Sequence, residues 1–396
     1  MKAILTLIAS FGAAFATFIL QVILSRNLEP QDFGLLALAN SITIIIGTFS
    51  SSGISSLLLR RASISPAESY ELVKTAIAST LFISSISYLT CSLTLIFYGI
   101  PLTYSVILST AIFALSAQSI LTTLGQIKNS AKTIAISQTT LPSMRATLAS
   151  ALLFSPAGVA VAAALIGAAN LASMALYIFS IRKMPISNES VKRAPSGMLE
   201  YIKSSLKYSV NGSINMAQIQ LSTTLIGSIH GVQAAGHMAI CNTLTAALYI
   251  APNTIFGTYL QKRFHTLSNA EKKKPITLSL VSFFAGLLAS ALIYMASDPI
   301  VTLLFGAQYQ QAIDLLRAVC PAIPVRFFIT GIGAAILSEE LVKKKISASA
   351  FGLFAQAALI VSLYKYGAYG IGASILIGEL LTASLYIKIY RKTFAK

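Results

Sequence analysis

The chain has 396 residues, of which 55% are hydrophobic and only 10% are charged, and its formal net charge is +17. Soluble domains contain about 25% charged residues, so this composition excludes a soluble globular protein and indicates a membrane protein. The excess of Lys and Arg is then expected in loops near anionic lipid head groups, and it does not predict a nucleic-acid partner.

Twelve apolar runs are long enough to cross a bilayer as helices, which takes roughly 20 residues each. The expected fold class is therefore an all-α polytopic membrane protein with 12 transmembrane helices. In chain order the runs cover residues 4–24, 34–58, 75–98, 103–126, 134–154, 157–180, 206–229, 236–259, 276–296, 318–337, 346–364 and 369–389.

The gaps between these runs alternate in charge. Of 29 Lys and Arg residues, 24 fall in one set of gaps, and the other set holds only Arg26, Arg317 and Lys365. Short loops rich in Lys and Arg remain cytoplasmic. We therefore expect both termini and the 182–205 and 262–275 loops in the cytoplasm, with the 299–316 segment on the opposite side of the membrane.

Part of the sequence pattern recurs after 202 residues. Residues 30–42 align without a gap with residues 232–244, and Gln, Gly, Ala and Asn match, the last as Asn40 and Asn242. A basic pair follows both stretches at the same distance. The shared register of loop, apolar run and basic end indicates an internal repeat.

This repeat predicts the domain organisation. An offset of six spans implies two six-helix lobes, residues 1–181 and 206–396, related by a pseudo-two-fold axis along the membrane normal. The polar stretch 182–205 is the predicted cytoplasmic linker between them. Parallel repeats of this kind are typical of transporters, which bind substrate between the halves near the middle of the membrane.

Ionisable residues inside apolar runs are the first candidates for function. Arg145, Arg326 and Glu379 lie in the fifth, tenth and twelfth runs, where each costs about 2.5–3.5 kcal/mol at the bilayer centre. Such residues pair with one another or line water. For Arg326 and Glu379 the sequence is compatible with a structural ion pair and with a role in an aqueous pathway. Glu379 is the only acidic residue inside a run and is the candidate for ion coupling.

The seventh run carries a polar stripe. Asn211, Asn215, Gln218 and Ser222 recur at steps of four, three and four residues, which places them on one helix face. Amides that face lipid would lack partners. The stripe therefore lines a cavity or joins helices, and the sequence is compatible with both.

The fifth run combines polar groups with a proline. Gln138 and Arg145 share a helix face, and Pro142 lies between them. Proline lacks the N–H that an α-helix requires, so we expect it to interrupt the hydrogen-bond ladder and expose carbonyl groups to the interior.

Catalytic and cofactor signatures are missing from the sequence. The three histidines are far apart, the three cysteines lie in apolar runs, and no Gly-Lys-Ser phosphate loop occurs. We therefore expect no enzyme activity, no cofactor and no metal site. The loops on the outer side are too short for the external domain of a polysaccharide polymerase.

Three passages resemble Wzx-type polysaccharide flippases, in the MOP superfamily that also contains MATE exporters and the lipid II flippase. Arg26 to Gly34 reads Arg-x-Leu-x-Pro-x-Asp-Phe-Gly. The stretch from Gly53 to Leu59 is followed by Arg60. Leu304 to Ala312 contains Phe-Gly-x-x-Tyr-x-x-Ala.

The resemblance implies a substrate and a site. The substrate would be an undecaprenyl-diphosphate-linked oligosaccharide, such as an O-antigen repeat unit, moved from the cytoplasmic to the periplasmic leaflet of a bacterial inner membrane. Membrane lipids and other polysaccharide-assembly proteins would be the partners, and an ion gradient would drive alternating access. The candidate substrate-binding residues, gathered around a cationic cavity, are Arg26, Arg60, Gln138, Arg145, Asn211, Asn215, Gln218 and Arg326.

Two alternatives belong to other functional classes. One is a MATE-like small-molecule antiporter, although the first run lacks the acidic residue that such exporters typically carry. The other is a membrane polysaccharide polymerase, which the short outer loops disfavour.

Overall fold

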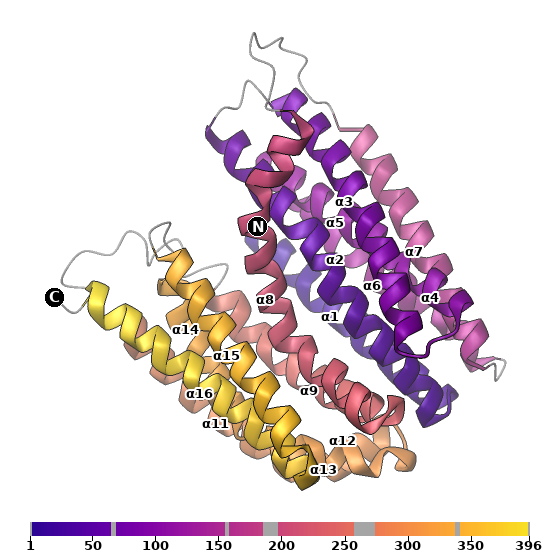
Figure 1. Ribbon diagram of the computed structural model, residues 1–396, viewed down its shortest axis with the longest axis vertical. Helices are drawn as coiled ribbons and strands as arrows, with labels where there is room; N and C mark the ends of the chain where they lie inside the picture. The colour runs from indigo at the N-terminus through magenta and orange to yellow at the C-terminus, as the bar shows by residue number, and fades with distance from the viewer. Residues whose placement is uncertain are drawn as a thin grey trace. The chain divides into compact units, whose positions relative to one another are not determined.

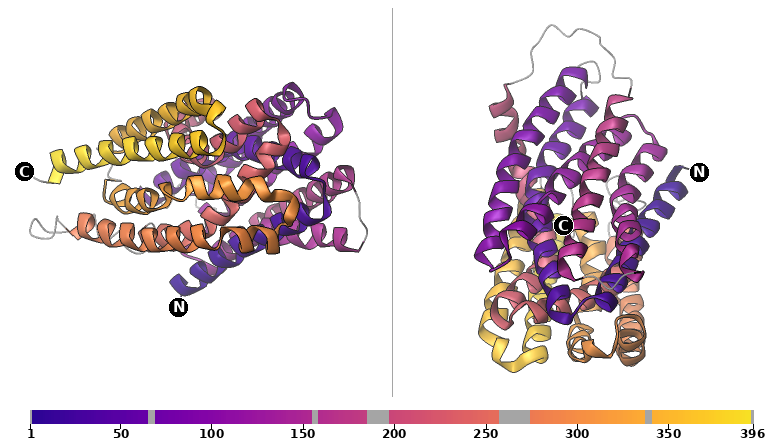
Figure 2. Two further views of the ribbon diagram at one scale, coloured as in Figure 1. Left: turned by 90° about the horizontal axis from the view of Figure 1, so that it is seen from below. Right: turned by 90° about the vertical axis from the view of Figure 1, so that its right-hand side faces the viewer.

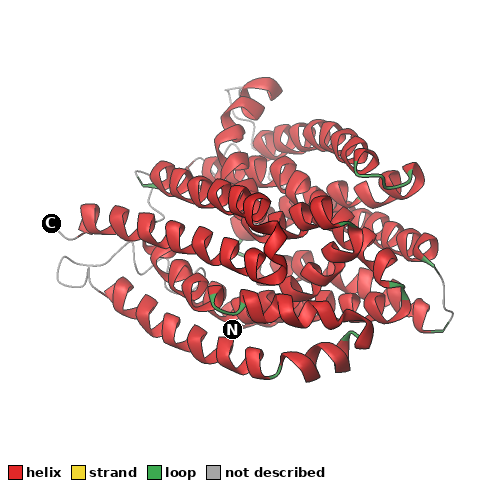
Figure 3. Ribbon diagram, turned by 60° about the horizontal axis from the view of Figure 1, so that its bottom comes forward, coloured by secondary structure: helices red, strands yellow, loops and turns green. Residues whose placement is uncertain are grey.

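The computed structural model describes residues 2–64, 69–154, 158–184, 197–256, 274–336 and 341–394. Within these ranges the chain is built from helices joined by short loops, and no strand occurs (Figure 3). This confirms the expected all-α class.

The chain divides into two compact units, Met1–Gln220 and Leu221–Lys396, and within each unit the helices run alongside one another (Figures 1 and 2). The boundary falls inside helix α8. The predicted linker at 182–205 includes residues 185–196, which lie outside the described ranges. The predicted lobes and their two-fold relation therefore remain predictions.

The first unit contains seven helices and most of an eighth, among the residues that the structure describes. These are α1 (Lys2–Asn27), α2 (Pro30–Ile64), α3 (Ser69–Phe97), α4 (Leu102–Ser109), α5 (Ala111–Ile127), α6 (Ala131–Ala149) with the 3₁₀ turn η2 (Ser150–Leu153), α7 (Val159–Arg182) and α8 (Met198–His230).

The second unit begins in the last turns of α8. In the described ranges it continues with α9 (Val232–Thr254), α11 (Lys274–Met295), α12 (Ser297–Leu304), η5 (Ala307–Tyr309), α13 (Gln310–Val319), α14 (Ala322–Ala335), α15 (Val342–Leu363), η6 (Tyr364–Tyr366) and α16 (Gly367–Phe394).

Long apolar helices make the protein a multi-pass membrane protein. By length and hydropathy, eight helical stretches in the described part of the chain qualify as spans. The number is nine if α13 and α14, bent by 54°, form one span. A single qualifying stretch of 51 residues contains both α15 and α16. Helices α6 and α8 do not qualify, and they are the ones that carry the polar faces noted in the sequence. The count of 12 spans remains a prediction.

Large apolar side chains cover the outer surfaces of the helices. Phe15 on α1, Phe97 at the end of α3, Phe284 on α11 and Phe354 on α15 are between 64% and 87% exposed. Water would oppose such exposure, whereas hydrocarbon does not, because lipid tails are themselves apolar. These faces are therefore suited to contact lipid.

The passages that carry the family resemblance have structural roles. A Cβ atom on Gly53 of α2 would collide with the Ser205 carbonyl and the Ser209 hydroxyl of α8, so glycine permits the close approach of these helices. Gly306 has a φ of 111°, which favours glycine. Its neighbours Phe305 and Tyr309 are fully buried. These glycines thus serve the fold.

The internal repeat agrees with the positions where two helices begin. Helix α2 begins at Pro30 and α9 at Val232, so the two starts differ by 202 residues, which is the offset of the sequence alignment. The aligned asparagines lie ten residues further along each helix. Asn40 contacts Arg145, while Asn242 donates to Thr223 Oγ1 at 2.8 Å. The aligned positions therefore share backbone structure but differ in their partners.

Candidate functional site

Arg145 is held in the first unit by two asparagines from neighbouring helices. Its Nε donates to Asn170 Oδ1 on α7 at 2.8 Å, and one terminal nitrogen donates to Asn40 Oδ1 on α2 at 3.4 Å. Asn170 is fully buried and in turn donates to Thr110 Oγ1 at 3.2 Å. Both partners of the guanidinium are neutral, so the cluster keeps a net positive charge.

This cluster lies near the middle of the expected membrane. Asn40 is ten residues from the start of α2 and Asn170 is eleven from the start of α7, which places both about 15–17 Å along their helices at 1.5 Å per residue. The hydrocarbon core is about 30 Å thick. Since Asn170 lies at the midpoint of α7, we expect the Arg145 guanidinium to lie well inside the core.

A small cavity adjoins the Arg145 guanidinium. Its volume is about 30 Å³, and Arg145, Asn40, Gln21 and Thr43 line it together with apolar side chains of α1, α2, α4, α5 and α7. A cavity of this size and polarity has room for a water molecule. The interior of the first unit thus presents a cation beside a polar, hydratable space.

Tyr177 of α7 contacts the backbone of α6 at Ser137 and Leu141. The Tyr177 hydroxyl of α7 accepts from the Leu141 N–H at 2.9 Å and donates to the Ser137 carbonyl at 3.0 Å. In an unbroken α-helix these two backbone groups pair with each other. Pro142 follows directly and has no N–H for the next rung. A buried tyrosine therefore bonds to the backbone of the rung directly before Pro142.

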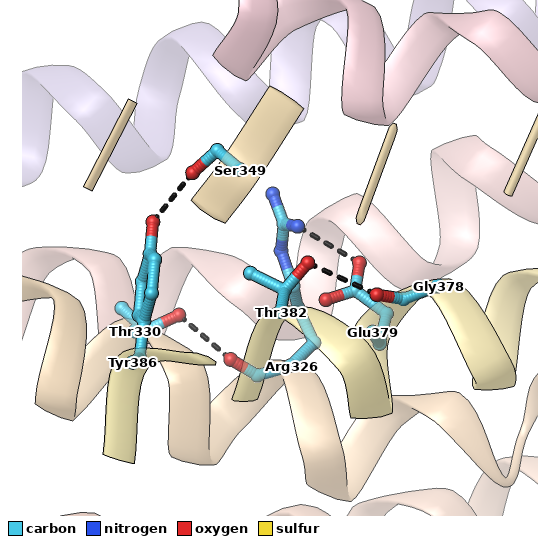
Figure 4. A network of polar contacts seen from close by, with 7 residues as sticks. All are labelled: Arg326, Thr330, Ser349, Gly378, Glu379, Thr382 and Tyr386. Carbon is cyan, nitrogen blue, oxygen red and sulfur yellow. Dashed lines mark hydrogen bonds and ion pairs between the residues drawn. The ribbon is translucent and has the colours of Figure 1, made fainter. Parts of the chain in front are cut away.

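In the second unit Arg326 is paired with an acidic side chain. One terminal nitrogen of Arg326 on α14 lies 2.8 Å from Glu379 Oε1 on α16 (Figure 4). Glu379 is 7% exposed, and its other oxygen, Oε2, is buried without a hydrogen-bond partner among the described residues. The structure thus brings these two predicted site residues together as an ion pair.

Polar groups continue from this pair along one face of α16. Thr382 and Tyr386 follow Glu379 at steps of three and four, and the Tyr386 hydroxyl lies 2.6 Å from Ser349 Oγ on α15 (Figure 4). The Lys345 ammonium, about one turn before Ser349 on α15, donates to the Gly333 carbonyl of α14 at 2.8 Å. A buried polar seam therefore joins α14, α15 and α16.

Other predicted site residues lie elsewhere. Gln138 accepts from Ser10 Oγ of α1 at 3.1 Å. Arg60 is exposed near the end of α2 and donates to the Tyr208 hydroxyl of α8 at 2.6 Å. It is twenty residues, or about 30 Å, beyond Asn40 along α2. Arg26 is exposed in the last turn of α1. The structure does not gather these residues around Arg145.

The polar stripe on α8 is described only in part. Gln218 is half-buried and Ser222 is fully buried. The side chains of Asn211 and Asn215 lie outside the described part of the chain. Their assignment to a binding face therefore remains a prediction.

Two partners of Arg145, Asn40 and Asn170, were not among the predicted site residues, although the sequence contains a signal for each. Asn40 occupies the matched asparagine position of the repeat, and Asn170 is a lone amide in the sixth apolar run. An amide in such a run requires a polar partner, and the neighbouring fifth run offers Arg145 as that partner. Tyr177 had no comparable signal, since tyrosines also lie at membrane interfaces.

Comparison with solved structures places this fold among membrane transporters. The lipid II flippase MurJ in an inward closed conformation matches with a TM-score of 0.71 and 15% identity over 99% of this chain and 90% of its own. The eukaryotic MATE transporter AtDTX14 matches with a TM-score of 0.66 and 15% identity, over 100% and 98%. A MOP superfamily transporter from Pyrococcus furiosus has a TM-score of 0.60 and 14% identity, over 100% and 95%.

The family follows from the sequence itself. Residues 23–314 match the family model described as polysaccharide biosynthesis protein. The chain belongs to this family, and its fold is that of the MOP superfamily. No curated protein sequence matches it.

Proposed function

We propose that the chain is a Wzx-type flippase. It moves an undecaprenyl-diphosphate-linked oligosaccharide, such as an O-antigen repeat unit, from the cytoplasmic to the periplasmic leaflet. The observation that carries this proposal is Arg145, a cation expected well inside the membrane core whose partners are neutral amides. Membership of the polysaccharide biosynthesis family and the likeness to the lipid II flippase support it.

The Arg145 guanidinium is suited to bind a diphosphate. Guanidinium has five N–H donors in a planar fork, and two of them are directed to Asn170 and Asn40. The other three remain for phosphate oxygens, which arginine binds in a forked geometry. A lysine at this position would supply only a point charge. Translocation of this kind requires no covalent step, so the proposal includes no enzyme activity.

The Arg326–Glu379 pair supports coupling to an ion gradient. As a pair the two side chains carry no net charge, whereas protonation of Glu379 leaves a net charge of +1 in a buried seam. Glu379 Oε2, which has no described partner, is the atom where a proton or small cation would bind. A change of charge at this depth biases which arrangement of helices is favoured, as alternating access requires.

Complementation of a deletion strain tests the substrate role of Arg145. Loss of the gene should trap single lipid-linked repeat units on the cytoplasmic face. Wild type should restore export, Arg145→Ala should reduce it at normal protein level, and Arg145→Lys should restore it in part. Losing one charge-assisted contact of about 1.5–3 kcal/mol corresponds to roughly ten- to one-hundred-fold. Normal export by Arg145→Ala would exclude the substrate role, and a mere loss of folded protein would leave Arg145 a structural residue.

A MATE-like antiporter is the second candidate, because MATE transporters share this fold over their whole length. The same deletion strain separates the two functions. A flippase changes the accumulation of lipid-linked repeat units and leaves dye efflux unaltered. An antiporter changes dye efflux and leaves the accumulation of lipid-linked repeat units unaltered.

We also propose that the protein lies in the bacterial inner membrane with both termini in the cytoplasm. Single cysteines introduced at the exposed positions Lys183 and Gln310, in a background without the three native cysteines, test this topology. An impermeant maleimide should label Gln310→Cys in whole cells and Lys183→Cys only after the membrane is opened. Labelling of Lys183→Cys from outside would overturn the orientation.

A further inference from the structure

A groove between α15 and α16 in the second unit combines lysines with apolar side chains. Its volume is about 570 Å³, and its lining includes Lys343 and Lys344 at the start of α15 and Lys388 and Lys392 near the end of α16. Phe351 and Leu385 form much of its apolar wall. The two helices lie side by side, antiparallel, along their length (Figure 1).

The groove faces away from the core of the second unit. Tyr386 and Tyr390 of α16 are buried in the hydrophobic core, whereas Lys388 and Lys392 are exposed on the other side of the same turns. Phe351 is 57% exposed. The groove therefore joins an apolar surface suited to contact lipid, at Phe351, to a basic one, at the exposed lysines.

The charge of the groove favours an anion with more than one phosphate. Four lysines line it, and no acidic residue does. The start of α15 adds the partial positive charge of a helix N-terminus beside Lys343 and Lys344. Like charges held this close repel one another unless an anion lies between them. Two phosphates, each between a pair of lysines, would match this arrangement.

The apolar wall selects a lipid over a soluble anion. Lys344 and Phe351 are seven residues apart on α15, which is about 10.5 Å along the helix. Lys344 lies at the start of the apolar stretch Lys343–Thr393, and Phe351 lies inside it. A ligand that fills the groove therefore has a charged head at the lysines and a hydrocarbon chain at Phe351 and Leu385. Basic pockets between transmembrane helices bind lipid head groups in this way.

We propose that this groove binds a diphosphatidylglycerol lipid, cardiolipin, from the surrounding leaflet. Its two phosphates contact Lys343, Lys344, Lys388 and Lys392, and its acyl chains lie against Phe351 and Leu385. The groove shares no lining residue with the cavity beside Arg145 or with the Arg326–Glu379 pair, and it does not depend on the flippase substrate. The bound lipid joins the ends of α15 and α16 and offsets the repulsion among the lysines.

Native mass spectrometry of the full-length protein in detergent tests the site. Cardiolipin should bind the wild type more tightly than phosphatidylglycerol does, and phosphatidylethanolamine should bind least. In Lys388→Gln/Lys392→Gln, cardiolipin binding should fall about ten- to thirty-fold, since each lysine near a phosphate contributes about 1 kcal/mol. The matched control is Lys128→Gln/Lys132→Gln, which removes two exposed lysines outside the groove and should bind cardiolipin as the wild type does.

A second variant tests the groove without changing its charge. Ser347→Trp on the exposed groove face of α15 should fill the space and weaken cardiolipin binding while all four lysines remain. If Lys388→Gln/Lys392→Gln and Lys128→Gln/Lys132→Gln lose cardiolipin binding equally, the lipid is attracted unspecifically to basic loops and the proposal is overturned. Undecaprenyl diphosphate displacing cardiolipin from the wild type, but not from Lys388→Gln/Lys392→Gln, would overturn it in favour of a substrate-loading site.

Discussion

The two units each bury an arginine, but they surround it differently. Arg145 in the first unit donates to two neutral asparagines, whereas Arg326 in the second is paired with Glu379 at 2.8 Å. The first cluster therefore keeps a charge of +1, and the second is neutral. Residues of the same type are thus surrounded by neutral amides in one unit and by a carboxylate in the other, and the proposed anion-binding and ion-coupling roles rest on this difference.

The energetic difference between the clusters follows from their partners. A lone cation inside the bilayer costs about 2.5–3.5 kcal/mol on insertion scales, and neutral amides offset only part of this. A carboxylate partner would offset more, but it would also compete with an anionic substrate. If Arg145 binds an anionic substrate as proposed, its amide partners leave the charge available at a cost in stability.

The largest effect is expected from removing the carboxylate in the second unit. Glu379→Gln leaves Arg326 as an uncompensated buried cation, which destabilises a protein by about 3–5 kcal/mol. We expect a clear loss of protein that remains monodisperse after heating in detergent. Thermal unfolding followed by size-exclusion chromatography measures it.

The double variant Arg326→Gln/Glu379→Gln separates folding from coupling. It should recover most of the folded protein, because no unpaired charge remains, and its export should no longer respond to an imposed proton or sodium gradient. Export that still follows a gradient would remove Glu379 from the coupling mechanism and leave the pair a structural one.

Asn170→Asp should make the first unit resemble the second. The new carboxylate would lie where Asn170 Oδ1 now accepts from Arg145 at 2.8 Å and would neutralise the guanidinium. We expect nearly normal protein levels and an export rate reduced roughly ten-fold or more, since a charge-assisted contact contributes about 1.5–3 kcal/mol. Wild-type export by this variant would mean that the net charge of the Arg145 cluster is unimportant.

The smallest effects are expected at two buried tyrosines. Tyr177→Phe removes a hydroxyl with two backbone partners, and Tyr386→Phe removes one that is paired with the Ser349 hydroxyl. A typical hydrogen bond contributes about 0.5–1.5 kcal/mol, so Tyr177→Phe should lower thermal stability more than Tyr386→Phe. Equal shifts would indicate that the Tyr177 hydroxyl does not hold α6.

The helices that cross the membrane can largely be predicted from the sequence, because the bilayer requires long apolar segments. Apolar length predicts helices, and the ranges around Arg145, Arg326 and Glu379 did prove helical. An ion pair between Arg326 and Glu379 can be predicted from the sequence, because a bilayer leaves few other partners for a buried charge. The sequence is also compatible with a role of both residues in an aqueous pathway. The dispersed positions of Arg26 and Arg60 could not be predicted, since charge type indicates affinity for phosphate but not location.

The partners of Arg145 required the structure for a different reason. Whether Asn40, Asn170 or a carboxylate meets the guanidinium depends on how α2, α6 and α7 are rotated about their axes, and all-round apolar helices contain little periodic signal to set that rotation. The same limit applies to Tyr177, whose hydroxyl meets α6 only because α7 presents that face.

The tyrosine inserted into α6 gives that helix a pivot. Pro142 has no N–H for its rung of the ladder, and the backbone groups of the preceding rung also bond to the Tyr177 hydroxyl, so bending there sacrifices fewer bonds than elsewhere along α6. Arg145 lies just beyond the pivot at the end of a lever arm of about 10 Å, and a tilt of about 10° would displace its guanidinium by about 2 Å. If Arg145 binds a diphosphate as proposed, we expect such a tilt to move the guanidinium towards or away from the phosphate, without any change in the number of buried charges.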